Sequence, residues 1–186
     1  MRVTSQILAM SKTFSYFAYG SNLLSKRIHI NNPSAVLVGP GKLLDHRLDF
    51  LTYSKRWGGA SATIVPMKNS HVWGAIWEID NDHMKCLDNQ EGVQDNLYFA
   101  KTVEIVLPNG EKRTCRVYQQ TATPEHVDDI KELPKDRQPS TVYLTTIILG
   151  AEESCLPDDY REYLKSIPDN GYKGKVDIGL DLKIVD

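Results

Sequence analysis

The stretch VWGAIWEI, residues 72–79, is apolar at every position except Glu78. A strand with one solvent-facing side alternates apolar and polar residues, whereas a strand covered on both faces does not. We therefore predict that residues 72–79 form a central strand of a sheet. Trp73 and Trp77 within it fit core positions better than they fit a platform for a ligand.

A hairpin signal lies downstream of this strand. Residues 97–107 and 111–120 flank Pro108-Asn109-Gly110, and Asn-Gly between two strand-like runs is a strong short-range indication of a β-hairpin. These two segments are therefore expected to be antiparallel neighbours. Further short strands, separated by glycine and proline, are predicted upstream over residues 16–19, 35–43, 48–53 and 61–65.

Helices are predicted between and after the strands. Ser21 and Asn22 follow an aromatic strand and Gly20, so we expect them to cap a helix that ends before Pro33. A second, short helix is predicted to end near Gly92. A late helix is indicated by side chains at positions 160, 163, 164 and 167, which share one helical face behind two aspartates.

This order of elements lacks the regular strand–helix alternation of a doubly wound sheet. It favours an α+β fold in which a small mixed or antiparallel sheet is barrel-like and carries flanking helices. Residues 121–139 hold three prolines and eight charged residues among nineteen positions and are expected to form an exposed loop. We expect one domain over residues 13–186 after a flexible leader, residues 1–12, in which Met10 is an alternative start.

Composition narrows the choice of partners. The 22 basic and 24 acidic residues give a net charge of −2 in a chain of 186 residues, so no basic field attracts nucleic acid or anionic lipid. No run of about 18 apolar residues is present, and we expect neither a membrane nor a nucleic acid as a partner. Three cysteines without CxxC spacing suit a reducing compartment, so a cytoplasmic protein is predicted.

Motifs for metals, cofactors and nucleophiles are missing from the sequence. The five histidines stand apart from one another, without ligand spacing, so no metal is expected. Cys86, Cys115 and Cys155 lie in apolar or strand-like surroundings, where buried structural thiols are the expectation. Neither a G-x-S-x-G elbow nor a phosphate-binding loop occurs, and no cofactor is predicted.

The segment YFAYGSNL, residues 16–23, is the first candidate for chemistry. A strand that runs into Gly20 and then into a capped helix presents backbone N–H groups and a positive dipole end, which together suit an anion such as a carboxylate. The alternative is that Gly20 only makes a turn and Ser21 only caps. The spacing alone does not identify a ligand.

The segment LDNQEGV, residues 87–93, is the second candidate. Glu91 lies next to a glycine at a helix end, where a carboxyl group held in a cleft has a raised pKa and can shuttle a proton. Asp88 is a competing carboxylate three positions earlier, and either group is equally well a solvated surface residue. Spacing leaves the choice between them open.

Taken in order, these motifs resemble the γ-glutamylcyclotransferases of animals. The match begins with FAYGSNLL at residues 17–24 and covers nearly the whole chain to Val176. Each motif is short, but their succession is specific. The further matching segments are residues 27–29, 32–35, 48–50, 57–59, 62–64, 72–74, 87–88, 90–93, 114–116, 171–172 and 174–176.

The resemblance implies a small mixed barrel fold and an enzyme that releases 5-oxoproline and a free amino acid from an L-γ-glutamyl amino acid. It assigns Glu91 as the acid/base, with Tyr98 and Tyr143 as pocket residues, and implies no cofactor and a possible homodimer. It also implies that the γ-glutamyl group is held by a loop formed by Tyr16, Phe17, Ala18, Tyr19, Gly20, Ser21 and Asn22.

Three alternatives keep the pocket but change its use. A γ-glutamylamine cyclotransferase would act on γ-glutamyl-ε-lysine, and a glutathione-specific relative would act on glutathione. A non-catalytic module would use the same pocket to bind a small anion. The presence of Glu91 beside an intact YGSN loop favours an enzyme.

Overall fold

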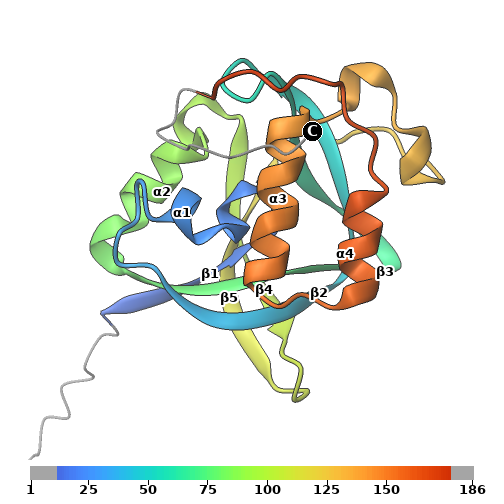
Figure 1. Cartoon of the computed structure of the whole chain (residues 1–186). Helices are drawn as coiled ribbons and strands as arrows, with labels where there is room; N and C mark the ends of the chain where they lie inside the picture. The colour runs from blue at the N-terminus through green and yellow to red at the C-terminus, as the bar shows by residue number, and fades with distance from the viewer. Residues whose placement is uncertain (1–11, 177–186) are drawn as a thin grey trace, which may run out of the picture.

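The computed structural model describes residues 12–176, in which five strands close into a barrel in the order β1-β3-β2-β4-β5 (Figure 1). β1 pairs antiparallel with β3 and, at Tyr16 and Arg116, parallel with β5, so the sheet is mixed. The predicted α+β barrel is confirmed. The predicted leader lies outside the described residues except for Lys12. The strands are β1 Thr13–Ala18, β2 Val36–Ser54, β3 Gly59–Asp80, β4 Tyr98–Val106 and β5 Lys112–Gln120.

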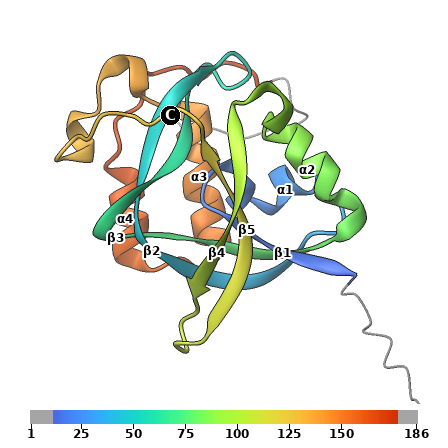
Figure 2. The same ribbon diagram turned by 180° about the vertical axis from the view of Figure 1, so that it is seen from behind.

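β3 is the central strand that its apolar stretch predicts. Trp77 pairs with Tyr16 of β1 on one side and with Leu37 of β2 on the other, and it is fully buried. Trp73 is only partly buried, packed against the core. The hairpin of β4 and β5 is also confirmed, and Figure 2 shows it reaching beyond the rest of the barrel.

The prediction of separate short strands over residues 35–43 and 48–53, and over 61–65 and 72–79, is wrong in one respect. Each pair merges into one long strand, because irregularities in the β2–β3 register take up the residues that read as breaks. Gly39 and Asp45, both at positive φ, lie at two of these register shifts. Such bulges bend a strand around a barrel without ending it.

The single helix predicted from Ser21 is two short pieces, the 3-10 helix η1 (Ser21–Leu23) and α1 (Ser25–Ile28), separated by an extended Leu24. No side chain caps either piece, so the predicted caps are wrong. The physical reason is that the buried amide of Asn22 is engaged elsewhere. It donates hydrogen bonds to Tyr16 and Glu91.

The remaining helices are packed on the outside of the barrel. α2 (Met84–Gln90) follows the 3-10 helix η2 (Asn81–His83) and ends just before Gly92, as predicted. The apolar residues 142–149 lie in α3 (Thr141–Glu153), which Ser140 caps, and α4 (Asp158–Lys165) is the predicted late helix. Short 3-10 helices also occur at η3 (Val93–Asp95), η4 (Ile130–Glu132) and η5 (Lys135–Arg137). Among residues 12–176, no helix is long and apolar enough to cross a bilayer.

The loop over residues 121–139 is mostly exposed, as predicted, but it is tied down at its end. Arg137 is buried, where its guanidinium forms an ion pair with Asp49 and its Nε donates to the carbonyl oxygen of Phe50 at 3.0 Å. Leu133 of the same loop is also buried. The loop therefore joins the core through β2.

α3 supports η1 through a close approach at Gly150. A Cβ atom at this position would collide with the backbone of Leu23 and Leu24. Ser154 adds a hydrogen bond of 3.2 Å to the carbonyl oxygen of Leu23. The position of the loop that follows β1 therefore depends on a glycine more than a hundred residues away.

We predict that Gly150→Ala lowers the free energy of unfolding by about 1–3 kcal/mol, because backbone atoms on both sides of the contact have to move. Urea denaturation followed by circular dichroism measures this. Leu149→Ala, on the exposed side of the same helix, is the control and should change stability far less. A Gly150→Ala protein as stable as the wild type would contradict the packing described.

Candidate active site

Most of the predicted site residues meet in one small chamber. Its volume is about 40 Å³, and residues from Tyr16 to Tyr143, far apart in the sequence, surround it. The lining comes from β1 and the loop after it, β3, the end of α2, β4, β5 and α3. It consists of Tyr16, Tyr19, Gly20, Ser21, Asn22, Ala62, Glu91, Tyr98, Tyr118 and Tyr143.

Two predicted residues do not line this chamber. Phe17 and Ala18 are buried in the barrel core, where the ring of Phe17 and the carbonyl oxygen of Ala18 lie against Gly74 of β3. Successive side chains of a strand point to opposite faces, so Phe17 cannot face the chamber when Tyr16 does. The loop implied by the resemblance therefore contributes five of its seven residues to the lining.

Glu91 stands where α2 ends and is held by a short chain of amides. Nδ2 of Asn22 donates to Oε1 of Glu91 at 3.2 Å and to the hydroxyl oxygen of Tyr16 at 3.1 Å. Nε2 of Gln90 in turn donates to Oδ1 of Asn22 at 3.0 Å. Gly92 takes a left-handed conformation with φ of 65° immediately afterwards, which an L side chain would disfavour. The orientation of the Glu91 side chain is therefore set both by the end of α2, which precedes it, and by Asn22 of η1.

The chamber changes the acidity of this carboxyl group. Burial raises the pKa of Glu91 from its usual value of 4.5 to about 7, Arg27 opposes the rise and Asp88 adds to it. A group with a pKa near neutrality can both accept and return a proton at physiological pH. Glu91 therefore has the property of a general acid/base.

The two candidate carboxylates lie in different surroundings. Oδ1 of Asp88 accepts hydrogen bonds from Nη2 of Arg116 at 2.6 Å and from the hydroxyl of Tyr118. Asp88 is therefore committed to an ion pair outside the lining of the chamber. Spacing in the sequence does not separate Asp88 from Glu91, whereas the family resemblance favours Glu91 and the fold places only Glu91 of the two in the lining of the chamber.

The tyrosines of the chamber are neutral hydrogen-bonding groups. The hydroxyl of Tyr98 donates to the carbonyl oxygen of Ala62 at 2.6 Å, and the hydroxyl oxygen of Tyr143 accepts from the backbone nitrogen of Ala62 at 3.2 Å. Burial raises the pKa of Tyr143 to about 12 and that of Tyr16, Tyr19 and Tyr98 well above the usual value. None of them can serve as the base near neutral pH.

Sequence reasoning missed Tyr118 and Ala62 in this lining. Tyr118 accepts a hydrogen bond from Tyr19 on its carbonyl oxygen at 2.6 Å, and its ring lies edge-on to that of Tyr16. It lies on the correctly predicted second strand of the hairpin, but no motif marks its side chain. The register that closes the barrel brings it to the chamber.

A larger cavity of about 340 Å³ adjoins the chamber and shares Ser21, Glu91, Tyr98 and Tyr143 with it. Glu91 therefore lies where a small enclosed space meets a wider one. A molecule that occupies both spaces would have its middle beside this carboxyl group. The side chains found in the outer space alone include Arg27, Trp57, Arg56, Tyr53 and Asp95.

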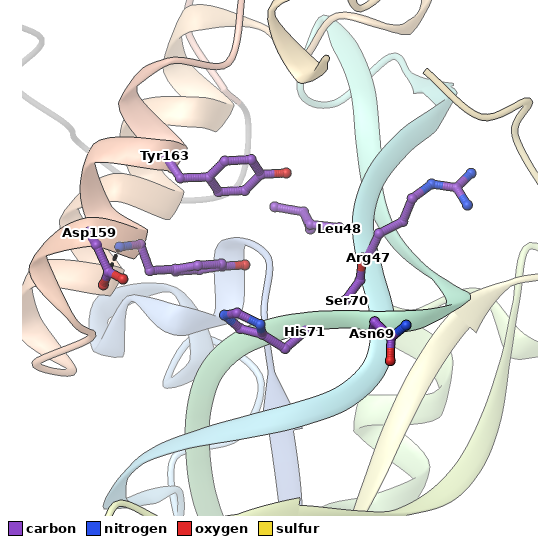
Figure 3. A pocket seen from close by; sticks show the side chains of 8 residues that line it. Arg47, Leu48, Asn69, Ser70, His71, Asp159 and Tyr163 are labelled. Carbon is purple, nitrogen blue, oxygen red and sulfur yellow. Dashed lines mark hydrogen bonds between the residues drawn. The ribbon is translucent and has the colours of Figure 1, made fainter. Parts of the chain in front are cut away.

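A separate cavity of about 370 Å³ lies between α4 and the paired strands β2 and β3 (Figure 3). None of the predicted site residues lines it. Its carboxylate, Asp159, is exposed and accepts a hydrogen bond from the backbone of Tyr160, and His71 is also exposed. Without an enclosed acid or base, this cavity is a poor candidate for catalysis.

The lining of the chamber contains no cysteine and no histidine. Among residues 12–176, no group of three or more His, Cys, Asp or Glu side chains is placed to hold a metal ion. Cys115 is buried, and burial raises its pKa to about 11. Cys86 and Cys155 are exposed, so the expectation of buried thiols is wrong for them. Cys86 lies on α2 and Cys155 follows α3, and both elements lie at the surface.

Comparisons with known proteins point to the same chemistry. The model of the AIG2-like family matches residues 71–164. A mouse (Mus musculus) protein called gamma-glutamylcyclotransferase is 40% identical over 169 residues, which cover 89% of this chain and 84% of the mouse protein. The chain belongs to the γ-glutamylcyclotransferase family. The resemblance found in the sequence, including its implication of an enzyme, is confirmed.

Solved structures agree with this family assignment. A structure of a gamma-glutamyl cyclotransferase superposes with a TM-score of 0.79 at 38% identity, over 88% of this chain and 93% of the other. A yeast structure described as a cyclotransferase specific to glutathione gives a TM-score of 0.56 at 13% identity, over 84% and 96% of the chains. The yeast protein shows only that the γ-glutamylcyclotransferase fold is shared.

The raised pKa of Glu91 also predicts a cost in stability. Folding raises the pKa from 4.5 to about 7, so the folded state holds its proton more tightly and loses that advantage as pH rises through 7. Glu91→Gln has no proton to lose. It should be more stable than the wild type at pH 8 by up to about 3 kcal/mol, with the difference shrinking towards pH 4.

Thermal unfolding of both proteins between pH 4 and 8 measures this difference. Glu111→Gln, which replaces an exposed carboxylate away from the chamber, serves as a control and should stay close to the wild type in stability at pH 8. A Glu91→Gln protein less stable than the wild type at pH 8 would show that the Glu91 carboxylate is not desolvated.

Proposed function

We propose that this protein converts L-γ-glutamyl amino acids to 5-oxoproline and a free amino acid, with Glu91 as general acid and base. The observation that carries the proposal is a carboxyl group with a pKa of about 7 at the mouth of a tyrosine-lined chamber. Family membership supplies the reaction type, and the chamber supplies a place for it.

The substrate brings its own nucleophile. Its α-amino nitrogen attacks the γ-carbonyl carbon, a C–N bond closes a five-membered ring, and the C–N bond to the leaving amino acid breaks. Well-oriented intramolecular attack is worth about 7–11 kcal/mol of the barrier. The first task of the protein is therefore to bend the γ-glutamyl chain back on itself.

The second task is to move protons. At neutral pH the α-amine is mostly an ammonium ion and is not nucleophilic, so a base has to remove one proton before the attack. The ring nitrogen loses a second proton as the lactam forms, and the departing nitrogen gains two and leaves as an ammonium ion. The Glu91 carboxylate carries these protons one at a time from the α-nitrogen to the leaving nitrogen, so it ends the cycle ionised. Its pKa of about 7 favours both transfers.

The third task is to stabilise negative charge. The substrate α-carboxylate and the oxyanion that forms at the γ-carbonyl both need donors. The backbone amides of residues 20–22 and the neutral hydroxyl group of Tyr143 are the donors we assign to these two anions, whereas the hydroxyl proton of Tyr98 is already donated to the carbonyl oxygen of Ala62. Gly20 allows a close approach, since a Cβ atom there would lie 3.2 Å from the Tyr143 hydroxyl oxygen.

The compartment and the assembly stay predictions. Free thiols at Cys86, Cys115 and Cys155 are compatible with a reducing cytoplasm. Homodimerisation is implied by the family resemblance. Sedimentation analysis of the purified protein measures the assembly directly.

Release of 5-oxoproline from γ-glutamyl-alanine, γ-glutamyl-ε-lysine and glutathione tests the function. We expect γ-glutamyl-alanine to be turned over faster than γ-glutamyl-ε-lysine and glutathione. Glu91→Gln should keep the fold and lose at least about 100-fold in kcat, because the amide keeps the shape and removes the proton acceptor. Ser21→Ala should lose less, because the donor assigned there is the backbone.

A fully active Glu91→Gln protein would contradict the mechanism in which Glu91 is the general acid and base. Binding of 5-oxoproline without turnover of any of the three substrates would leave only a small-anion-binding module. Preferred turnover of γ-glutamyl-ε-lysine or of glutathione would instead keep the chemistry and change the substrate.

The pH dependence of kcat/KM reports the base in the free enzyme. The base acts in its ionised form, so kcat/KM should fall about tenfold per pH unit below the Glu91 pKa of about 7. The residual kcat/KM of Glu91→Gln should not show this fall below pH 7. A wild-type profile that stays flat down to pH 5 would be incompatible with the assigned acidity.

A further inference from the structure

Arg27 is a buried cation that the reaction described so far does not use. It lies in α1, its residue is 3% exposed, and its guanidinium carbon is 6.0 Å from the centre of the Trp57 ring. Nε and Nη1 are both buried without a hydrogen-bond partner in the part of the chain that the structure describes. Burial lowers the pKa of Arg27, so the cation is held in an unfavourable environment.

Such an arrangement is costly unless something supplies acceptors. A guanidinium group presents its donors in a planar fork that fits a carboxylate with two parallel hydrogen bonds. Buried donors that remain unsatisfied carry a full desolvation penalty. The free donors of Arg27 therefore point to an anionic ligand at this position.

The position of Arg27 indicates which anion this is. Arg27 lines the outer cavity and is absent from the lining of the inner chamber, whereas Glu91 lines both. If the γ-glutamyl group is held on the chamber side of Glu91 and its scissile amide lies at Glu91, the leaving amino acid extends into the outer cavity. The α-carboxylate of that amino acid is the anion that the outer cavity would meet.

We propose that Arg27 binds the α-carboxylate of the leaving amino acid and so selects γ-glutamyl amino acids over γ-glutamyl amines. The inference rests on the proposed function and adds a residue that determines specificity. Trp57, whose ring packs at 4.8 Å from that of Tyr143, holds the guanidinium by a cation–π contact while its donors stay free.

The other charged groups of the outer cavity fit this role less well. Arg56 lines the same space but is exposed, so water already satisfies its donors and weakens its field. Asp95 is exposed and has the wrong sign for a carboxylate, and Glu91 has the assigned catalytic role. Arg27 is the buried cation of this lining.

A matched pair of substrates tests the proposal. γ-Glutamyl-ethylamide is γ-glutamyl-alanine with the carboxylate replaced by hydrogen, so the two share the γ-glutamyl group and the scissile amide. We expect the wild type to prefer γ-glutamyl-alanine in kcat/KM by about 10- to 100-fold, the range of hydrogen bonds to charged groups. Arg27→Gln should bring the ratio of the two kcat/KM values close to one, and Arg27→Lys should restore part of it.

The ratio separates this role from three others. Arg27 could instead only stabilise the fold, only tune Glu91, or bind the glutamyl α-carboxylate. In each of these cases Arg27→Gln lowers kcat/KM equally for both substrates, and the ratio of the two values stays as in the wild type. Each of these results would overturn the proposal. Lys26→Gln, which removes an exposed positive charge from the same helix, is the control and should keep the wild-type ratio. Loss of the ratio in Arg56→Gln but not in Arg27→Gln would assign the carboxylate to Arg56.

The wild type alone still tests the proposal if the Arg27 variants do not fold. Equal kcat/KM for both substrates would contradict a carboxylate receptor at any residue. Absence of 5-oxoproline from every γ-glutamyl compound would instead contradict the proposed function, and the inference would fall with it. Turnover of both substrates without preference would leave the function intact and remove only the inference.

Discussion

Partial enclosure of one carboxyl group among tyrosines is the constraint on which the site depends. Glu91 is enclosed by tyrosines and held by the amide of Asn22, with 3.2 Å between Nδ2 and Oε1. Enclosure makes the carboxyl a weaker acid, and the neighbouring cation of Arg27 limits the effect. The balance gives a group that can exchange a proton near neutral pH without a metal or a cofactor.

The fold is arranged around this enclosure. β1 brings Tyr16 between β3 and β5, and the chain then turns into η1, where Asn22 turns its side chain towards Glu91 instead of capping a helix. α3 presses against η1 at Gly150 and contributes Tyr143 to the chamber. Residues far apart in the sequence are therefore needed to surround a single carboxylate.

Local patterns in the sequence predict the parts that depend on local physics. The buried strand over residues 72–79, the hairpin at Asn109-Gly110 and the late helix were all predictable from apolar spacing and turn chemistry. Long-range pairing decides the rest. Bulges merged short strands into β2 and β3, the hydrogen bonds of Asn22 divided the first helix, and the ion pair of Asp88 with Arg116 left Glu91 as the chamber carboxylate. Tyr118 and the buried Arg27 carry no signal that spacing alone could reveal.

The acidity of Glu91 is the most direct test of the proposed chemistry. The side-chain carboxyl carbon can be followed by ¹³C NMR in protein labelled at glutamate, and its signal is assigned by its loss in Glu91→Gln. We expect a titration midpoint of about 7 in the free protein. A midpoint near 4.5, the usual value for glutamate, would show a solvated carboxylate and would contradict the central claim.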